Sequence, residues 1–266
     1  MAIRHNQEIS GPLGTTAPPV ALSERQSLIW LDAQLFPATH SSNLVLIIEI
    51  KGRLDPDRVQ NAWQRTVQDF DALRIRIHPH EPTQAWGTAN ESLPFLRLGS
   101  SLELQQWIEE RCAEPLGPGS RLWEAALLSV DHDTHVFYMC QHHLIADGLS
   151  MVNLSERLSQ HYEGTEPPPP RDFADYLDSE AEYARSEKAE KDRAYWTDYL
   201  KNPPPPIELY GQERNSTSVG LSRRWLTQPS EISQDLRDLS TEDSFRTLSP
   251  ALSRLVVLAT STIAFL

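Results

Sequence analysis

The stretch THVFYMCQHHLIADG, residues 134–148, joins an apolar run to two adjacent histidines and an Asp-Gly pair. Residues 134–143 are expected to form a strand that pairs in a hairpin with residues 121–130, because both runs are largely apolar and the turn signal DHDT lies near their junction. Residues 149–162 then carry apolar side chains at helical spacing. The sequence therefore places the histidine pair between a buried strand and a helix.

The two histidines are expected to have different roles. Side chains alternate between the two faces of a strand, so His142 and His143 are expected to point to opposite faces. This disfavours zinc, because chelation needs both rings on one side and no third ligand stands at a typical spacing. His143, at the end of a buried strand, is the candidate general base, since a backbone carbonyl can hold such a ring in one tautomer. A single strand-end histidine is more often structural than catalytic, but the joint pattern with Asp-Gly is much rarer by chance.

The residues after the histidines are expected to shape the loop. Asp147 is expected to be buried, and a buried carboxylate needs a cationic partner. In LRIRIH, residues 73–78, apolar side chains alternate with arginines, and Arg74 is the favoured partner of Asp147. Gly148 permits a tight turn or a close backbone approach into the following helix, although an Asp-Gly pair alone is most often just a turn.

The rest of the chain predicts further elements from apolar periodicity and capping residues, such as Ser23 and the Asp55-Pro56 pair at two helix starts. We expect helices over 22–35, 55–70, 102–114 and 173–200, a strand buried on both faces over 43–50, a weak strand in SRRWLT (222–227), and a last helix that begins at Ser249–Pro250.

Composition excludes several functions. The chain has 266 residues and a formal net charge of −13, which argues against nucleic acids and anionic membrane surfaces as partners. The two cysteines imply no disulfide framework. The N-terminal residues hold no apolar stretch of signal-peptide length, and the apolar run at the other end, about 12 residues, is too short to span a bilayer. We expect a soluble, cytoplasmic protein.

The motif HHLIADG, residues 142–148, resembles the HHxxxDG motif of nonribosomal peptide synthetase condensation domains, which belong to the chloramphenicol acetyltransferase-like superfamily. The stretch FDALRIRI (70–77) resembles the family's HExLRTxF segment, with Asp71 where histidine is usual, Ile75 where threonine is usual, and Arg74 retained. Three further stretches are similar to family motifs: LSERQSLIWL (22–31), AEPLGPGSRLWEAALLSV (113–130), and DFADYLDSE (172–180) followed by AYWTDYL (194–200).

The resemblance implies an α/β fold, a two-layer α+β sandwich in which a mixed sheet is flanked by helices, and a reaction in which an acceptor amine attacks a carrier-bound acyl or aminoacyl thioester. By the same resemblance, His143 would be the catalytic histidine and His142 would support its loop. Asp147 would be salt-bridged to Arg74, and the backbone amide of Gly148 would approach the reacting carbonyl, where negative charge develops. No cofactor would be bound directly, because phosphopantetheine arms of donor and acceptor carrier proteins, or an acyl-CoA donor, bring the substrates.

The complete family has roughly twice the length of this chain, so we expect a flexible arm over 1–20 and an N-terminal chloramphenicol acetyltransferase-like subdomain over 21–165. A proline-bracketed long helix and connecting region would follow over 166–245, and the first helix of a truncated C-terminal subdomain over 246–266. The chain could be a fragment, a naturally short protein, or one that a second protein completes. Its opening methionine and short arm favour a starter-type domain with an acyl donor. Two alternatives stay open: an O-acyltransferase that forms an ester from an acyl thioester, and a non-catalytic module that docks carriers.

Overall fold

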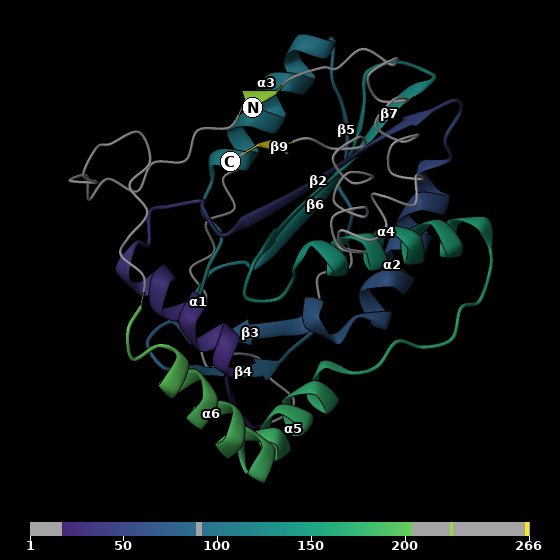
Figure 1. Cartoon of the computed structure of the whole chain (residues 1–266). Helices are drawn as coiled ribbons and strands as arrows, with labels where there is room; N and C mark the ends of the chain where they lie inside the picture. The colour runs from purple at the N-terminus through teal and green to yellow at the C-terminus, as the bar shows by residue number, and fades with distance from the viewer. Residues whose placement is uncertain (1–17, 89–91, 204–223, 226–263, 266) are drawn as a thin grey trace, which may run out of the picture. The chain divides into compact units, whose positions relative to one another are not determined.

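The computed structural model describes residues 18–88, 92–203, 224–225 and 264–265 (Figure 1). Internal contacts divide the chain into two units, Met1–Thr217 and Ser218–Leu266. In the second unit, β8 (Arg224–Trp225) pairs antiparallel with β9 (Ala264–Phe265). Strand β8 confirms the weak strand expected in SRRWLT. Strand β9 occupies two residues that we expected to be helical, and the remainder of that predicted helix lies outside the described residues.

The larger sheet of the first unit is mixed. Its strand order is β2-β7-β6-β5, with antiparallel pairing except between β5 and β6, which are parallel. A smaller antiparallel sheet has the order β1-β4-β3. The strand bounds are β1 Val20–Ala21, β2 Asn43–Lys51, β3 Ile75–Ile77, β4 Thr83–Trp86, β5 Phe95–Arg97, β6 Trp123–Ser129 and β7 Thr134–His142. The hairpin expected from residues 121–143 is therefore confirmed as β6–β7. Val20, which we placed in a flexible arm, belongs to β1, and residues 1–17 of that arm lie outside the described residues.

Helices cover both faces of the larger sheet. Their bounds are α1 Glu24–Leu35, α2 Pro56–Asp69, α3 Ser101–Ala113, α4 Gly148–Glu163, α5 Phe173–Ala184 and α6 Glu187–Tyr199, with a 3₁₀ turn, η1, over Asp71–Arg74. Figure 1 shows α2 and α4 beside each other against the sheet. None of the helices in the described part of the chain is long and apolar enough to cross a membrane.

Strand β7 separates two apolar clusters. Phe137 and Met139 belong to the cluster that holds residues of α2 and α4, whereas Tyr138 and Cys140 belong to the cluster that holds Ile108 and other residues of α3. This is the alternation expected from the sequence, with both faces buried because helices cover both. The predicted fold class, a mixed sheet flanked by helices, is confirmed, and α3 adds a further layer.

Helix α2 follows directly from its sequence. The carboxylate of Asp55 accepts hydrogen bonds from the backbone N–H groups of Asp57 (3.0 Å) and Arg58 (3.2 Å), and Pro56 occupies the first turn. The residues of this helix that are buried are Val59, Ala62, Trp63, Thr66 and Val67. Trp63 packs edge-on against Trp123, with ring centroids 5.5 Å apart.

The helix predicted over residues 173–200 is instead two helices. Helix α5 ends at Ala184, and Ser186 caps α6 by accepting a hydrogen bond from the N–H of Ala189 (3.2 Å). The hydroxyl of Ser186 also donates to the carbonyl of Tyr183 (2.7 Å). A serine that bonds the backbone on both sides competes with a continuous helix, and this ends α5.

Strand β2 is less buried than we expected, and helix α1 buries a polar residue. Strand β2 is an edge of the described sheet, bonded to β7 alone, so it is only partly buried and Glu49 is exposed. On α1, the leucines at helical spacing do not face the core: Leu28 is 70% exposed and Leu35 is 64% exposed. The buried residue of this helix is Gln26. The leucines at helical spacing therefore do not mark the buried face of α1.

Candidate active site

The histidine pair is held by backbone bonds from both sides. The N–H of His142 donates to the carbonyl of Leu122, and the N–H of His143 donates to the carbonyl of Ser42, each at 2.8 Å. Strand β7 ends at His142, and α4 begins at Gly148. The loop that carries the motif therefore starts from a central strand anchored on its two neighbours.

The two histidines have opposite environments. His142 is 2% exposed, whereas His143 is exposed. This difference agrees with the expectation that the rings point in different directions. His143 is consequently the ring of the pair that can meet a substrate.

His142 is built to be neutral. Its Nδ1 accepts a hydrogen bond from the backbone N–H of Leu144 (3.1 Å), so the neutral ring carries its proton on Nε2. Burial, with a smaller contribution from the neighbouring His143, lowers the pKa of His142 to about 4. At neutral pH this ring therefore carries no charge and accepts a hydrogen bond from the motif loop.

Asp147 caps α4. Its Oδ1 accepts hydrogen bonds from the N–H (2.8 Å) and the hydroxyl (2.7 Å) of Ser150, whose Oγ accepts from the N–H of Asp147 (3.2 Å). The hydrogen bonds from Ser150 are the main reason that the pKa of Asp147 lies below its usual value, and the nearby His143 contributes. Asp147 is exposed, so the expectation of a buried carboxylate was wrong.

The predicted ion pair between Arg74 and Asp147 is not formed in the structure. The Nη1 of Arg74 instead donates to the carbonyls of Val67 (3.2 Å) and Gln68 (2.7 Å), at the C-terminal end of α2. A cation is favourable there because the last carbonyls of a helix lack intrahelical partners. Our expectation assumed that Arg74 lay in a strand, where alternation would direct its side chain. It lies in η1, where strand alternation does not apply.

Gly148 is the first residue of α4, and its position does not need a glycine for packing. A Cβ added at Gly148 would meet no heavy atom within 4 Å, and its backbone does not have a positive φ angle. The residue is exposed. The backbone at the N-terminus of α4 therefore adjoins open space, on the same loop as His143.

The loop combines an exposed imidazole with the N-terminus of a helix. An imidazole can accept a proton from an attacking nucleophile, and helix N-terminal amides stabilise negative charge that develops nearby. Within the part of the chain that the structure describes, no group of three or more His, Cys, Asp or Glu side chains could hold a metal ion. These residues could thus support acyl transfer by acid–base chemistry and hydrogen bonding.

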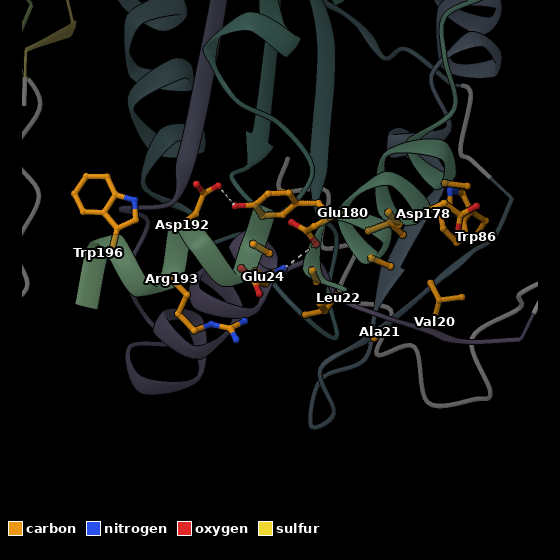
Figure 2. A pocket seen from close by; sticks show the side chains of 16 residues that line it. Val20, Ala21, Leu22, Glu24, Trp86, Asp178, Glu180, Asp192, Arg193 and Trp196 are labelled. Carbon is orange, nitrogen blue, oxygen red and sulfur yellow. Dashed lines mark hydrogen bonds between the residues drawn. The ribbon is translucent and has the colours of Figure 1, made fainter. Parts of the chain in front are cut away.

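A pocket of the first unit lies away from the motif loop. Its volume is about 590 Å³, and residues of β1, α5 and α6 line it together with Leu22, Glu24 and Trp86 (Figure 2). No residue of 142–148 lines it. The hydroxyl of Tyr183 donates to Asp192 (2.7 Å) in this pocket. This pocket therefore does not include the motif, and we place the candidate site at the loop 142–148, where His143 is exposed.

One residue near the site was missed by our sequence reasoning. The buried amide of Gln26 donates from Nε2 to the carbonyl of Leu144 (3.0 Å), within the motif loop. Gln26 also forms a capping box with Ser23 at the start of α1. The spacing of a serine and a glutamine three residues later indicates that cap, but no local signal indicates a contact 118 residues away.

The chain resembles condensation domains in sequence and in structure. The family model described as "Condensation domain" matches residues 18–253. Surfactin synthase subunit 1 of Bacillus subtilis (strain 168) is 28% identical over 75% of this chain and 6% of its own length, and bacitracin synthase 3 of Bacillus licheniformis is 26% identical over 73% of this chain and 3% of its length. The chain therefore matches a small part of these curated relatives.

Solved structures give the same answer. The starter condensation domain of rhizomide synthetase RzmA is 27% identical, with a TM-score of 0.66 over 71% of this chain and 50% of that chain. The first condensation domain of the calcium-dependent antibiotic synthetase, solved with a substrate analogue, is 26% identical, with a TM-score of 0.69 over 84% of this chain and 57% of that chain. Since the family model covers most of the sequence, and the chain spans about half the length of the solved domains, this chain belongs to the condensation-domain family and corresponds to part of such a domain.

Proposed function

We propose that this chain is the N-terminal part of a condensation domain, in which His143 serves the attack of an acceptor amine on a donor acyl thioester. The observation that carries the proposal is the exposed ring of His143 on the loop between buried β7 and the N-terminus of α4. A buried strand end fixes the backbone of the catalytic group, while its side chain stays accessible to substrate.

The proposed reaction forms a C–N bond and breaks a C–S bond. The amine nitrogen attacks the thioester carbonyl, His143 accepts or orients the amine proton, and the sulfur leaves as a thiol once it has received a proton. An imidazolium formed at His143 would lie near the carboxylate of Asp147, since the two groups interact electrostatically. The hydrogen bonds of Asp147 with Ser150 hold the start of α4.

Backbone amides at the start of α4 are the proposed donors to the carbonyl oxygen. Negative charge develops on this oxygen during the attack, and helix N-terminal amides stabilise such charge. The open space around Gly148 supports a close approach there, because a side chain would occupy that space. His142 supports the same loop from the buried side.

The proposed donor is an acyl chain on a phosphopantetheine arm, which coenzyme A and carrier proteins share. Structures of the starter condensation domain of rhizomide synthetase with C8-CoA, and with C8-CoA and Leu-SNAC, support this choice for a related domain. Donor and acceptor carrier proteins are the proposed partners, and no cofactor is proposed to bind directly. Because such donors are made inside the cell, we also propose a cytoplasmic location.

Helix α1 has an exposed apolar face that we propose is covered by the second half of a complete condensation domain. Leu28 (70% exposed), Leu31 (50%) and Leu35 (64%) share one face of α1. The solved condensation domains are about twice as long as the part that this chain matches. We therefore propose that a second subdomain covers this leucine face and supplies the other wall of the active site.

The proposed function is tested with C8-CoA as donor and Leu-SNAC as acceptor. The chain is assayed alone and with the second half of a starter condensation domain added, and acylated Leu-SNAC is followed by mass spectrometry. His143→Ala is expected to lower the rate by about 10² to 10⁴-fold, the usual contribution of a general base. The melting temperature should stay unchanged, because the side chain is exposed.

The matched control is His132→Ala, which removes another exposed histidine, in the β6–β7 turn. This variant should keep the full rate. If the wild-type chain is active and His143→Ala keeps the same rate, His143 has no role in the mechanism. If an alcohol acceptor in the same mixture is acylated and the amine is not, the chain is an ester-forming acyltransferase.

A further inference from the structure

The residue after His143 is held at both of its peptide groups by buried side chains. The N–H of Leu144 donates to Nδ1 of His142 (3.1 Å), and the carbonyl of Leu144 accepts from Nε2 of Gln26 (3.0 Å). His142 lies beside Leu144 in sequence, but Gln26 comes from α1, 118 residues away. The backbone that follows His143 is therefore fixed by a tertiary contact as well as a local one.

The side chain of Gln26 uses its full hydrogen-bonding capacity. A glutamine amide can donate two hydrogen bonds and accept two. Nε2 donates to Leu144 O and to Oε1 of Gln84 (2.9 Å), while Oε1 accepts from the N–H of Ser23 (3.0 Å) and from Nε2 of Gln84 (2.9 Å). Gln26 is 4% exposed and Gln84 is 0% exposed. A buried amide with every partner in place has one orientation, so it acts as a rigid connector.

The network also connects three elements that meet at the loop. Gln26 belongs to α1, Gln84 belongs to β4, and Leu144 belongs to the loop between β7 and α4. Gln84 adds a bond from Nε2 to the carbonyl of Ala21 in β1 (3.3 Å). Hydrogen bonds thereby hold the loop in place relative to α1 and to the smaller sheet.

A capping role alone does not explain the glutamine. In a capping box the third helical residue can be glutamate or glutamine, because either accepts the N–H of the cap residue. A glutamate carboxylate could still accept from Ser23 and from Gln84, but it could not donate to Leu144 O. The amide nitrogen of Gln26 is the part that reaches the motif loop.

We propose that Gln26 is a positioning residue for His143: its amide fixes the carbonyl of Leu144 and so sets the backbone from which the His143 ring extends. This inference rests on the proposed role of His143 for its catalytic consequence, but the positioning itself is a property of the fold. Gln26 does not touch the reacting atoms. It acts through the Leu144 peptide.

The test uses Gln26→Met in the 266-residue chain, with Gln84→Met as the matched control. Both variants break the reciprocal pair between the two amides, but only Gln26→Met removes the donor to Leu144 O. Hydrogen exchange of the Leu144 and Ile145 amides is measured, with amides of the β6–β7 hairpin as the internal reference. Gln26→Met should speed exchange in the loop by about tenfold or more, because the loop can open without unfolding the sheet, and Gln84→Met should not.

The double variant Gln26→Met/Gln84→Met guards against a single variant that does not fold. It replaces both amides by apolar groups of similar shape, which is less disruptive than leaving one buried amide unpaired. It should show the same fast exchange in the loop. Equal exchange in all variants, or faster exchange spread evenly through the hairpin, would overturn the proposal, because Gln26 would then stabilise the whole fold and not the loop.

The catalytic consequence is measured with C8-CoA and Leu-SNAC. Gln26→Met is expected to lower kcat by about tenfold while KM stays within about twofold, since misplacing a catalytic group slows the bound complex without weakening binding. Unchanged kcat in Gln26→Met, with His143→Ala inactive, overturns the positioning role in catalysis. Full activity in His143→Ala overturns the proposed function instead, and the exchange result still decides whether Gln26 holds the loop.

Discussion

Two regions of the first unit differ in how deeply their side chains are buried. One is strand β7, which leads into the motif loop, and the other is the helix pair α5–α6. In β7, every residue from His135 to His142 is buried. In α5 no residue is buried, and in α6 only Ala189 is buried. The strand obtains its burial from helices on both faces of the sheet, within the same unit of the chain.

The aromatic residues of α6 pack mainly on one another. Tyr195 and Trp196 have ring centroids 5.3 Å apart, and Trp196 and Tyr199 have centroids 5.7 Å apart, yet each of the three side chains is more than half exposed. The candidate site therefore lies at the end of a strand whose side chains are buried within the first unit, whereas the aromatic side chains of α6 are exposed. We therefore expect substitutions around β7 to change the stability of this chain, and substitutions on the aromatic face of α6 to leave it nearly unchanged.

The largest effect on stability is expected from Trp63→Ala. Trp63 is fully buried and contacts Trp123 and Phe137, the latter in β7, so the truncation leaves a large cavity beneath the strand. The free energy of unfolding should fall by about 3–5 kcal/mol, measured by urea denaturation. A loss smaller than about 1 kcal/mol would mean that the core under β7 can repack and that the contrast with α6 is weaker than the burial indicates.

A somewhat smaller effect is expected when the pH is lowered, through His142. Its pKa is about 4 in the folded chain and has an ordinary value of 6.5, so above pH 6.5 the ring is neutral in both states and its contribution to stability is complete. Between pH 6.5 and pH 4 the unfolded chain binds a proton that the folded chain excludes. The free energy of unfolding should therefore decrease by up to about 3 kcal/mol over this range.

The measurement compares the wild-type chain with His142→Gln by urea denaturation at about pH 7 and about pH 4.5, on either side of most of this titration. Other groups also titrate in this range, so the difference between the two proteins isolates the contribution of His142. The variant should lose less stability than the wild type on acidification. Equal losses would show that the His142 ring is hydrated or protonated in the folded chain.

Asp147→Ala is expected to cost about 1 kcal/mol of stability, the usual contribution of a helix N-cap. The structure gives Asp147 local partners in Ser150 and none in Arg74, so a double-mutant cycle with Arg74→Met should show coupling near zero. The same cycle with Ser150→Ala should show coupling, because the two residues bond one another. Strong coupling to Arg74 would restore the ion pair that the family resemblance implied.

The smallest effect is expected from Trp196→Ala, which should change the free energy of unfolding by less than about 0.5 kcal/mol because the ring is 55% exposed. Together, Trp63→Ala and Trp196→Ala compare the same substitution in the core beneath β7 and on the exposed face of α6. A loss above about 2 kcal/mol would show that the α6 aromatic face is buried in solution by another part of the chain or by a second copy. Dependence of that loss on protein concentration would identify the second copy.

Elements with local causes were predictable from sequence. The cap of α2 depends on Asp55 and Pro56, which adjoin the helix, and the β6–β7 hairpin depends on two apolar runs and the turn between them. Strand alternation predicted different environments for His142 and His143, and the structure shows the first buried and the second exposed, although β7 ends at His142. The break between α5 and α6 also has a local cause, the hydroxyl of Ser186. It could not be predicted from the sequence, because serine is common within charged helices.

The sequence by itself determined the hairpin and the motif at its end, because both depend on residues that are neighbours along the chain. Only the tertiary structure decided that Arg74 bonds the end of α2, that α1 buries Gln26 and exposes its leucines, and that the Gln26 amide reaches Leu144. The physical reason is distance along the sequence. A buried polar side chain must find its hydrogen-bond partner wherever the fold brings one, and no local pattern reveals a partner 118 residues away.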